Sequence, residues 1–173
     1  MIELESERLL IRELSENDLA AILPVLLSNE AFLLQQEGSE GEPGRYDLAR
    51  WQRDWHITQF MPGSHALGCF LKPRSEAVGY IGYLEENEDG QPWLGVLVID
   101  AAHQRQGLGT EVFQRLAQYF RVEYAWPVLH AGTAQQNQTG LAFLQALGFR
   151  PYKTVANRLA SGLQDLTFLE LAL

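Results

Sequence analysis

Apolar residues along this chain follow two patterns, short runs typical of buried strands and helical spacing typical of amphipathic helices. The runs predict seven strands, over residues 8–13, 66–71, 78–84, 93–99, 128–133, 152–159 and 164–171. The helical spacing predicts four helices, one beginning after Ser15 and three over residues 47–60, 107–120 and 137–147. The order is one strand, two helices and three strands, then helix, strand, helix and two strands, which predicts an α+β fold with a central mixed sheet.

Residues 36–46 separate the first two predicted helices and contain three glycines, one proline and three glutamates. This composition is typical of a loop. Too little chain precedes the loop to form a separate domain, so we expect a single domain over residues 1–173. In the first predicted helix, Pro24 interrupts an otherwise regular apolar stripe and should bend the helix or limit its regularity.

The composition of the 173 residues is that of an ordinary globular protein, with 46% hydrophobic and 20% charged residues. No apolar run reaches the roughly 18 residues that a membrane-spanning helix needs. The single cysteine, Cys69, cannot form an internal disulfide. We therefore expect a cytoplasmic protein with no membrane partner. The net charge of −9 disfavours nucleic acid as a partner and favours a cationic substrate such as an amine.

The segment Gln104-Arg105-Gln106-Gly107-Leu108-Gly109-Thr110 links a predicted strand to a predicted helix. Backbone N–H groups at a helix N-terminus lack partners inside the helix and bind phosphate readily. A nucleoside triphosphate loop would need a lysine after its last glycine, and none follows Gly109. A dinucleotide loop would need a third glycine where Val112 stands. Both of those phosphate sites are therefore disfavoured.

The spacing of Gln104, Gly107 and Gly109 fits the pattern Q/R-x-x-G-x-G/A, which resembles the acyl-CoA pyrophosphate loop of the GNAT N-acetyltransferase superfamily. A second segment, Asn137 to Phe149, is similar to the superfamily's asparagine, helix and Gly-Phe segment, and the order of elements matches over residues 93–149. The opening Arg8-Leu9-Leu10-Ile11-Arg12, and His130-Ala131-Gly132-Thr133 followed by Asn137, resemble the branch that includes ribosomal-protein alanine acetyltransferases.

This resemblance implies a central, mostly antiparallel sheet of about seven strands with a splayed parallel pair, flanked by about four helices. It also implies acetyl-CoA as acyl donor, with no metal. The backbone of Val98 and Ile99 would pair with the pantetheine arm. The pyrophosphate would rest on the N–H groups of residues 104–110, where a Cβ at either glycine would hold the backbone away. The expected donor contacts are Val98, Ile99, Gln104, Arg105, Gln106, Gly107, Leu108, Gly109, Thr110, Asn137 and Phe143.

Three of these residues have a structural alternative. Asn137 is a preferred helix N-cap and could serve only that role, whereas the resemblance implies that it also contacts the pantetheine or its phosphates. Phe143 fits the wall of a pocket or the core better than a chemical role. Arg105 is either a phosphate contact or an exposed charge.

The implied reaction is direct attack of a primary amine, on a small molecule or a protein N-terminus, on the thioester. A backbone N–H of strand 93–99 could stabilise the oxyanion. The tyrosine that often protonates the thiolate is replaced by Leu144, so the catalytic residues stay unassigned. Candidate bases are Glu85, Glu86, Asp100, His103 and His130, and a structural histidine is the simpler interpretation of His130.

The acceptor pocket in such folds involves the segment here spanning residues 27–60, which contains Phe32, Trp51, Trp55 and His56. These residues could line a pocket or form core. A homodimer is possible. The alternative function is a non-catalytic acyl-CoA-binding or sensing protein, favoured by Leu144 and the lack of one clear base. A protein-interaction module built on residues 36–46 or 85–90 is a third hypothesis.

Overall fold

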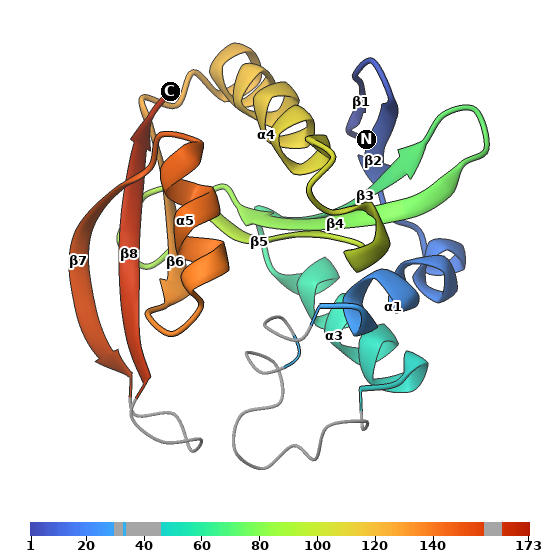
Figure 1. Cartoon of the computed structure of the whole chain (residues 1–173), viewed down its shortest axis with the longest axis horizontal. Helices are drawn as coiled ribbons and strands as arrows, with labels where there is room; N and C mark the ends of the chain where they lie inside the picture. Colours follow the sequence, from blue (N-terminus) through green and yellow to red (C-terminus); the bar gives the residue numbers. More distant parts are fainter. Residues whose placement is uncertain (30–32, 34–45, 158–163) are drawn as a thin grey trace.

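The computed structural model describes residues 1–29, 33, 46–157 and 164–173, and within them one sheet carries the fold (Figure 1). Its strands are β1 (Glu3–Glu5), β2 (Leu9–Glu13), β3 (Ser64–Leu71), β4 (Glu76–Leu84), β5 (Trp93–Ile99), β6 (Val128–Ala134), β7 (Arg150–Asn157) and β8 (Gln164–Ala172). The helices are α1 (Leu19–Leu27), α3 (Leu48–Phe60), α4 (Leu108–Tyr119) and α5 (Gln138–Ala146). The spatial order of the strands is β1-β2-β3-β4-β5-β6-β8-β7, and only β5 and β6 are parallel.

All seven predicted strands and all four predicted helices are present, so the expected α+β fold with a mostly antiparallel sheet is confirmed. The sequence patterns missed β1, a three-residue edge strand in which only Leu4 is apolar. The predicted strand 152–159 begins earlier, at Arg150, and residues 158–159 lie outside the described residues, as do Phe32 and residues 36–45 of the expected loop. None of the described helices is both long enough and apolar enough to span a bilayer.

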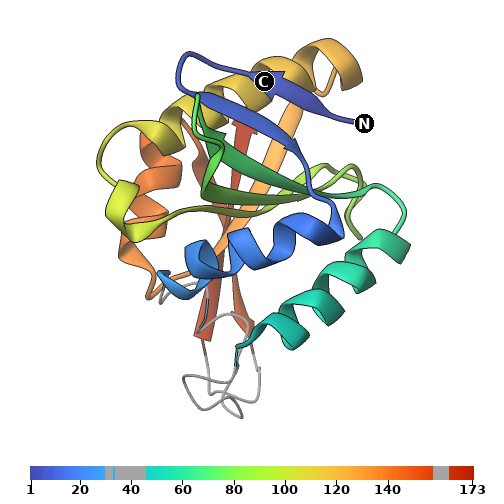
Figure 2. The same cartoon turned by 90° about the vertical axis from the view of Figure 1, so that its right-hand side faces the viewer.

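Two hydrophobic cores lie on the two faces of the sheet. Figure 2 shows α4 on one face and α1 with α3 on the other. The first core joins Val112 and Leu116 of α4 to the sheet and to α5, and the second joins α1 and α3 to β3 and β4. Trp51 and Trp55 are 2% and 8% exposed, and the Trp51 ring packs edge-on against Tyr80 with 5.1 Å between centroids. The two tryptophans are therefore core residues of α3.

The parallel pair separates soon after it begins. β5 pairs with β6 only through Trp93 with His130 and Leu94 with Ala131, although both strands continue beyond this point. A bulge coincides with the separation, because β4 pairs with Leu94 and then with Val96, leaving Gly95 without a partner on that strand. The expected splayed pair is confirmed, and its divergence leaves one backbone edge of β5 unpaired by β6 (Figure 1).

Candidate functional site

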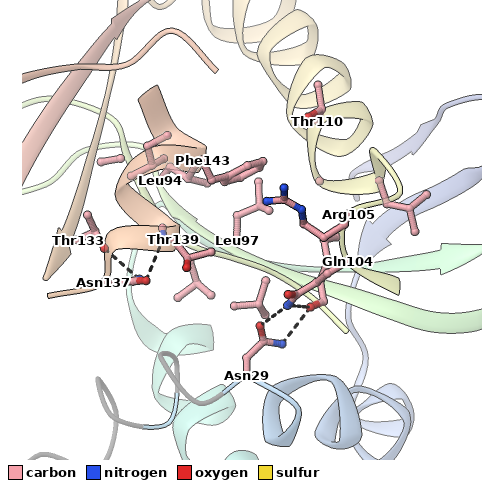
Figure 3. Close-up of a pocket in the computed structure, with 18 of the residues that line it drawn as sticks. Asn29, Leu94, Leu97, Gln104, Arg105, Thr110, Thr133, Asn137, Thr139 and Phe143 are labelled. Carbon is pink, nitrogen blue, oxygen red and sulfur yellow. Dashed lines mark hydrogen bonds between the residues drawn. The ribbon is translucent and has the colours of Figure 1, made fainter. Parts of the chain in front are cut away.

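The gap between β5 and β6 continues into a cavity of about 710 Å³ (Figure 3). Its walls are β5, the loop that follows, the first turn of α4, part of β6 and the start of α5. The cavity therefore lies at the carboxyl end of β5, where open α/β sheets commonly bind ligands. Of the residues expected from the sequence, it is lined by Val98, Ile99, Gln104, Arg105, Gly107, Leu108, Gly109, Thr110, Asn137 and Phe143.

The loop before α4 turns sharply at two residues with positive φ. Arg105 has φ of +62° and Gly107, the N-cap of α4, has φ of +81°. The first helical bond from this cap runs from the N–H of Glu111 to the carbonyl of Gly107. The N–H groups of Leu108, Gly109 and Thr110 therefore precede the helical bonding pattern and form the positive end of the α4 dipole at the cavity.

Gly109 lets α4 approach its neighbours closely. A Cβ built on Gly109 would lie 3.1 Å from Cζ of Phe143 and 3.6 Å from Cγ1 of Ile99. Any side chain at this position would therefore fill space between α4, α5 and β5. Figure 3 shows the Arg105 guanidinium directed into the same cavity, toward Phe143.

Register with β4 decides which backbone groups of β5 face the gap. Val98 pairs with Tyr80, and the N–H of Asp100 donates to the carbonyl of Val78. Because alternate residues of a strand direct their backbone groups to opposite edges, Val98 bonds toward β4, whereas Leu97 and Ile99 face the gap. Leu97 lines the cavity together with Val98 and Ile99, although the sequence-based expectation did not include it.

The carbonyl of Ile99 is held by two side-chain amides, those of Asn29 and Gln104, which Figure 3 shows next to each other. It accepts from Nδ2 of Asn29 at 3.1 Å and from Nε2 of Gln104 at 2.9 Å, and Gln104 also donates to Oδ1 of Asn29 at 3.0 Å. These bonds tie the end of α1 and the glycine loop to the end of β5. Nothing in the sequence singled out Asn29, which lies 70 residues before Ile99.

Asn137 uses both ends of its amide inside the protein. Its Oδ1 accepts from the N–H of Gly140 at 3.0 Å, which makes it the N-cap of α5, and its Nδ2 donates to Oγ1 of Thr133 at 3.2 Å. Asn137 thus has the capping role that its sequence position predicts.

Gln106 was expected to contact the donor, but it is not among the residues that line the cavity. Its side chain donates to the carbonyl of Ala102 at 3.2 Å.

The sequence model of one protein family, described as the acetyltransferase (GNAT) domain, matches residues 8–150 of this chain. The chain belongs to the GNAT acetyltransferase family. No curated protein sequence matches this GNAT chain significantly. Family membership makes it an N-acetyltransferase with acetyl-CoA as the family's donor, and nothing found supports the alternative of a non-catalytic acyl-CoA sensor.

Solved GNAT structures share the fold over almost the whole chain. A GNAT-family acetyltransferase from Bacillus anthracis has a TM-score of 0.78 at 15% identity, covering 99% of this chain and 98% of that one. Ribosomal-protein-S5-alanine acetyltransferase from Vibrio fischeri has a TM-score of 0.73 at 15% identity, with 99% and 97% covered. RimL, a ribosomal L7/L12 alpha-N-protein acetyltransferase in complex with coenzyme A, has a TM-score of 0.79 at 14% identity, with 99% and 98% covered.

Of the candidate bases in this GNAT protein, only His103 lines the cavity. Its Nδ1 lies 3.0 Å from Oδ1 of Asp100, which caps the short 3-10 turn Ala101–His103. Glu85 lies elsewhere, 2.7 Å from Nε2 of His65. Glu86 does not line the cavity either.

His130 lies on the opposite face of β6 from the core that contains Leu129 and Ala131. Its Nδ1 is 3.1 Å from Oδ2 of Asp89 and 3.2 Å from the hydroxyl of Tyr152, and its ring packs edge-on against Trp93. Hydrogen bonds from Trp93, Gln91 and His130 outweigh the effect of burial and lower the pKa of Asp89. This is the hydrogen-bonded structural histidine that the simpler interpretation expected.

Leu144 lines the cavity and is 9% exposed, so the usual tyrosine position does face the site but carries no proton donor. Among the residues that the structure describes, no carboxylate lines the cavity, and no group of three His, Cys, Asp or Glu side chains is placed to hold a metal ion.

Proposed function

We propose that this protein transfers the acetyl group of acetyl-CoA to a primary amine, either a protein N-terminus or a small molecule, by direct attack on the thioester. The observation that carries the proposal is the unpaired edge of β5 leading from the glycine loop to the bulge at Gly95. A linear molecule with a phosphate end and amide groups along its length matches this arrangement.

The phosphate end of the donor is assigned to the first turn of α4. Backbone N–H groups of Leu108, Gly109 and Thr110 offer donors with the helix dipole behind them, and Arg105 adds a positive charge in the cavity. The amide-bearing arm would pair with the gap-facing backbone of Leu97 and Ile99, as an added strand pairs with a free edge. Because two amides already hold the Ile99 carbonyl, its N–H and the groups of Leu97 are the better partners.

The reacting thioester is assigned to the region of Gly95. This residue lines the cavity at the point where β5 and β6 part, and the bulge removes it from the β4 ladder. A backbone N–H beside the bulge can stabilise the developing oxyanion without reorganisation, since it is fixed in the sheet before the reaction begins. The neutral amine attacks the thioester carbonyl, the C–N bond forms and the C–S bond breaks. The proton that the amine nitrogen gives up passes to solvent, and the departing thiolate takes up a proton from solvent, so that CoA leaves as a thiol.

The acceptor class is supported by chemistry and by the relatives. An N-terminal α-amine has a pKa near 7.7–8.0, so roughly a tenth of it is neutral at pH 7, whereas a lysine amine is almost wholly charged. Such an acceptor demands less of an active-site base. Two of the similar structures are named as acetyltransferases of ribosomal proteins, one of alanine on S5 and one of the α-amine of L7/L12. The net charge of −9 favours approach of a cationic acceptor.

A paired-substrate assay tests the proposal. Purified protein is incubated with acetyl-CoA and short peptides that have free or formylated N-termini, alongside a panel of small amines. CoA release is followed with a thiol reagent, and the product mass confirms transfer. We expect release only with free amines. Equal release with formylated peptides, or none with any amine, would overturn the proposal.

A further inference from the structure

A cluster of Ser6, Arg8 and Glu111 joins the β1–β2 turn to the first turn of α4. The carboxylate of Glu111 accepts from the hydroxyl of Ser6 at 2.7 Å, from the N–H of Arg8 at 2.9 Å, and from Nε and Nη2 of Arg8 at 2.7 Å each. The Glu111 side chain is 17% exposed. Segments about 100 residues apart are thus joined by an ion pair in which two guanidinium nitrogens contact the same oxygen, Oε2 of Glu111.

The same guanidinium reaches the glycine loop. Nη1 of Arg8 donates to the carbonyl oxygen of Gln106 at 3.0 Å, and Nη2 lies 3.6 Å from the position of a Cβ on Gly107. Gln106 stands between the two residues of positive φ, Arg105 and Gly107. The Arg8 bond therefore fixes the peptide carbonyl at the centre of the turn, and so helps to set the direction of the N–H groups on its cavity side.

Charge gives Arg8 a second effect on the loop. Glu111 is a carboxylate in the first turn of α4, the turn to which the donor's phosphates are assigned. Burial acts to raise the pKa of Glu111, but the hydrogen bonds from Arg8 and Ser6 outweigh it and keep the group ionised. Without Arg8 this negative charge would be uncompensated and would repel an anion bound nearby.

We propose that Arg8 is a positioning residue for the phosphate end of the donor: it holds the carbonyl of Gln106 and neutralises Glu111, without any role in the chemical step. The inference rests on the proposed function, since it assumes that the Gln104–Thr110 loop binds the pyrophosphate of CoA. It also gives a physical role to the first arginine of the Arg8–Arg12 motif, which lies far from the loop in sequence.

Arg12, on strand β2 four residues after Arg8, provides a matched control. It also pairs with one carboxylate through two nitrogens, Nη1 to Oδ2 of Asp18 at 2.9 Å and Nη2 to Oδ1 at 2.7 Å, and its guanidinium lies 4.4 Å from the centroid of the Phe70 ring. These contacts belong to the α1 side of the sheet and none of them involves the glycine loop. Replacing Arg12 therefore removes an equivalent ion pair while leaving the phosphate end of the site intact.

The test compares the binding of CoA with that of S-acetylpantetheine, which lacks the phosphates, by calorimetry on the full chain. We expect Arg8→Ala to weaken CoA binding roughly tenfold, the loss typical of one hydrogen bond to a charged group, and to leave S-acetylpantetheine binding unchanged. Arg8→Lys keeps the positive charge but not the planar guanidinium with its several donors, so it should recover part of the lost affinity for CoA. Arg12→Ala should lower the thermal midpoint without changing the affinity for either ligand.

Steady-state kinetics and a double variant test the role of Arg8 in two further ways. In the acetyl-transfer assay, Arg8→Ala should raise KM for acetyl-CoA with kcat nearly unchanged, because a positioning residue for binding leaves the chemical step alone. Adding Glu111→Gln should restore part of the CoA affinity, since the repelling charge is then absent.

Three outcomes would overturn the inference. Arg8→Ala could bind CoA as tightly as the wild type, or it could lose affinity for both ligands equally, which would indicate a general structural role. In either case the proposed function would stand. If the wild type bound neither CoA nor S-acetylpantetheine, the proposed function would fall and this inference with it.

Discussion

The side chain of Gln104 donates to the main-chain carbonyl of Ile99 at 2.9 Å and so closes the glycine loop onto the end of β5. One amide thus links the element that carries the helix N-terminus to the element that offers the free backbone edge. Both parts of the proposed donor site depend on this contact for their relative placement. The loop and the strand therefore act as one site rather than as two neighbouring features.

Replacing Gln104 with methionine keeps the length of the side chain and removes its donor. We expect the variant to lose about 0.5–1.5 kcal/mol of stability, the usual net value of one hydrogen bond, and to bind CoA several-fold more weakly. Gln138→Met is the control, because Gln138 also donates to a main-chain carbonyl, that of Gln135 at 2.7 Å, but does not line the cavity. Equal CoA affinity in both variants would contradict the role given to Gln104.

Gly107 and Gly90 offer a matched pair of left-handed glycines. Gly107 has φ of +81° at the cavity, and Gly90 has φ of +72° in an open turn where a Cβ would meet nothing within 4 Å. Alanine at either position should cost roughly 1–2 kcal/mol of folding free energy through backbone strain. Only Gly107→Ala should also weaken CoA binding, as measured by calorimetry. Similar CoA affinity of the two variants would argue against the phosphate role of the loop.

Asn137 can be tested as a cap separately from any contact with the donor. We expect Asn137→Ala to lower the free energy of unfolding by about 1 kcal/mol, and Asn137→Ser to restore most of that stability, because serine also caps helices well. Both amide ends are bonded to Gly140 and Thr133, so CoA affinity should stay close to wild type in the serine variant. A stable serine variant with much weaker CoA binding would show that the amide contacts the donor directly.

Acid should destabilise the protein partly through Asp18. The Arg12 guanidinium hydrogen-bonds this carboxyl and, together with Ser15, holds the pKa of Asp18 well below its usual value despite burial. Because the pKa of Asp18 is lower in the folded state than in the unfolded state, where it is near 3.9, ionised Asp18 stabilises the fold at pH values above the unfolded pKa. This contribution is lost as the pH falls toward the folded-state pKa. The free energy of unfolding should therefore decline below about pH 4.

Urea unfolding at pH 7, 4 and 3 measures this effect. Asp18→Asn should be less stable than wild type at pH 7 by about 2 kcal/mol and should lose less on acidification. Glu88→Gln, in an exposed part of the β4–β5 loop, serves as the control and should behave like wild type. Parallel acid profiles for wild type and Asp18→Asn would refute the role of this pair.

Strand and helix positions were predictable because the core-facing residues follow clear periods. The 3.6-residue spacing in α4 and the apolar run of β5 correspond to side chains that pack on the sheet. The edge strand β1 was not predictable, since it has one apolar residue and forms only by pairing with β2. The observed ends of the elements differ from the predicted ends by one or two residues. At α3, for example, the helix begins at Leu48 because Asp47 is its N-cap.

The proposed donor site was only partly predictable, because its finer geometry depends on tertiary pairing. The glycine loop was visible from its own spacing. The register with β4 and the bulge at Gly95 decide whether the backbone groups of Val98 or those of Leu97 face the gap. Neither the register nor the bulge can be predicted from the sequence of β5 alone. Asn29 and Arg8 join the site from distant segments, so local patterns could not assign them.

The claim that the splayed strands hold the donor is tested most directly by calorimetric titration of CoA into the wild type and Gly109→Val. The account predicts one CoA per wild-type chain and no measurable binding to Gly109→Val, with the folded state retained by circular dichroism, because the added side chain fills space beside Phe143 and Ile99. Undiminished CoA binding by Gly109→Val, or its absence in the wild type, would contradict the account.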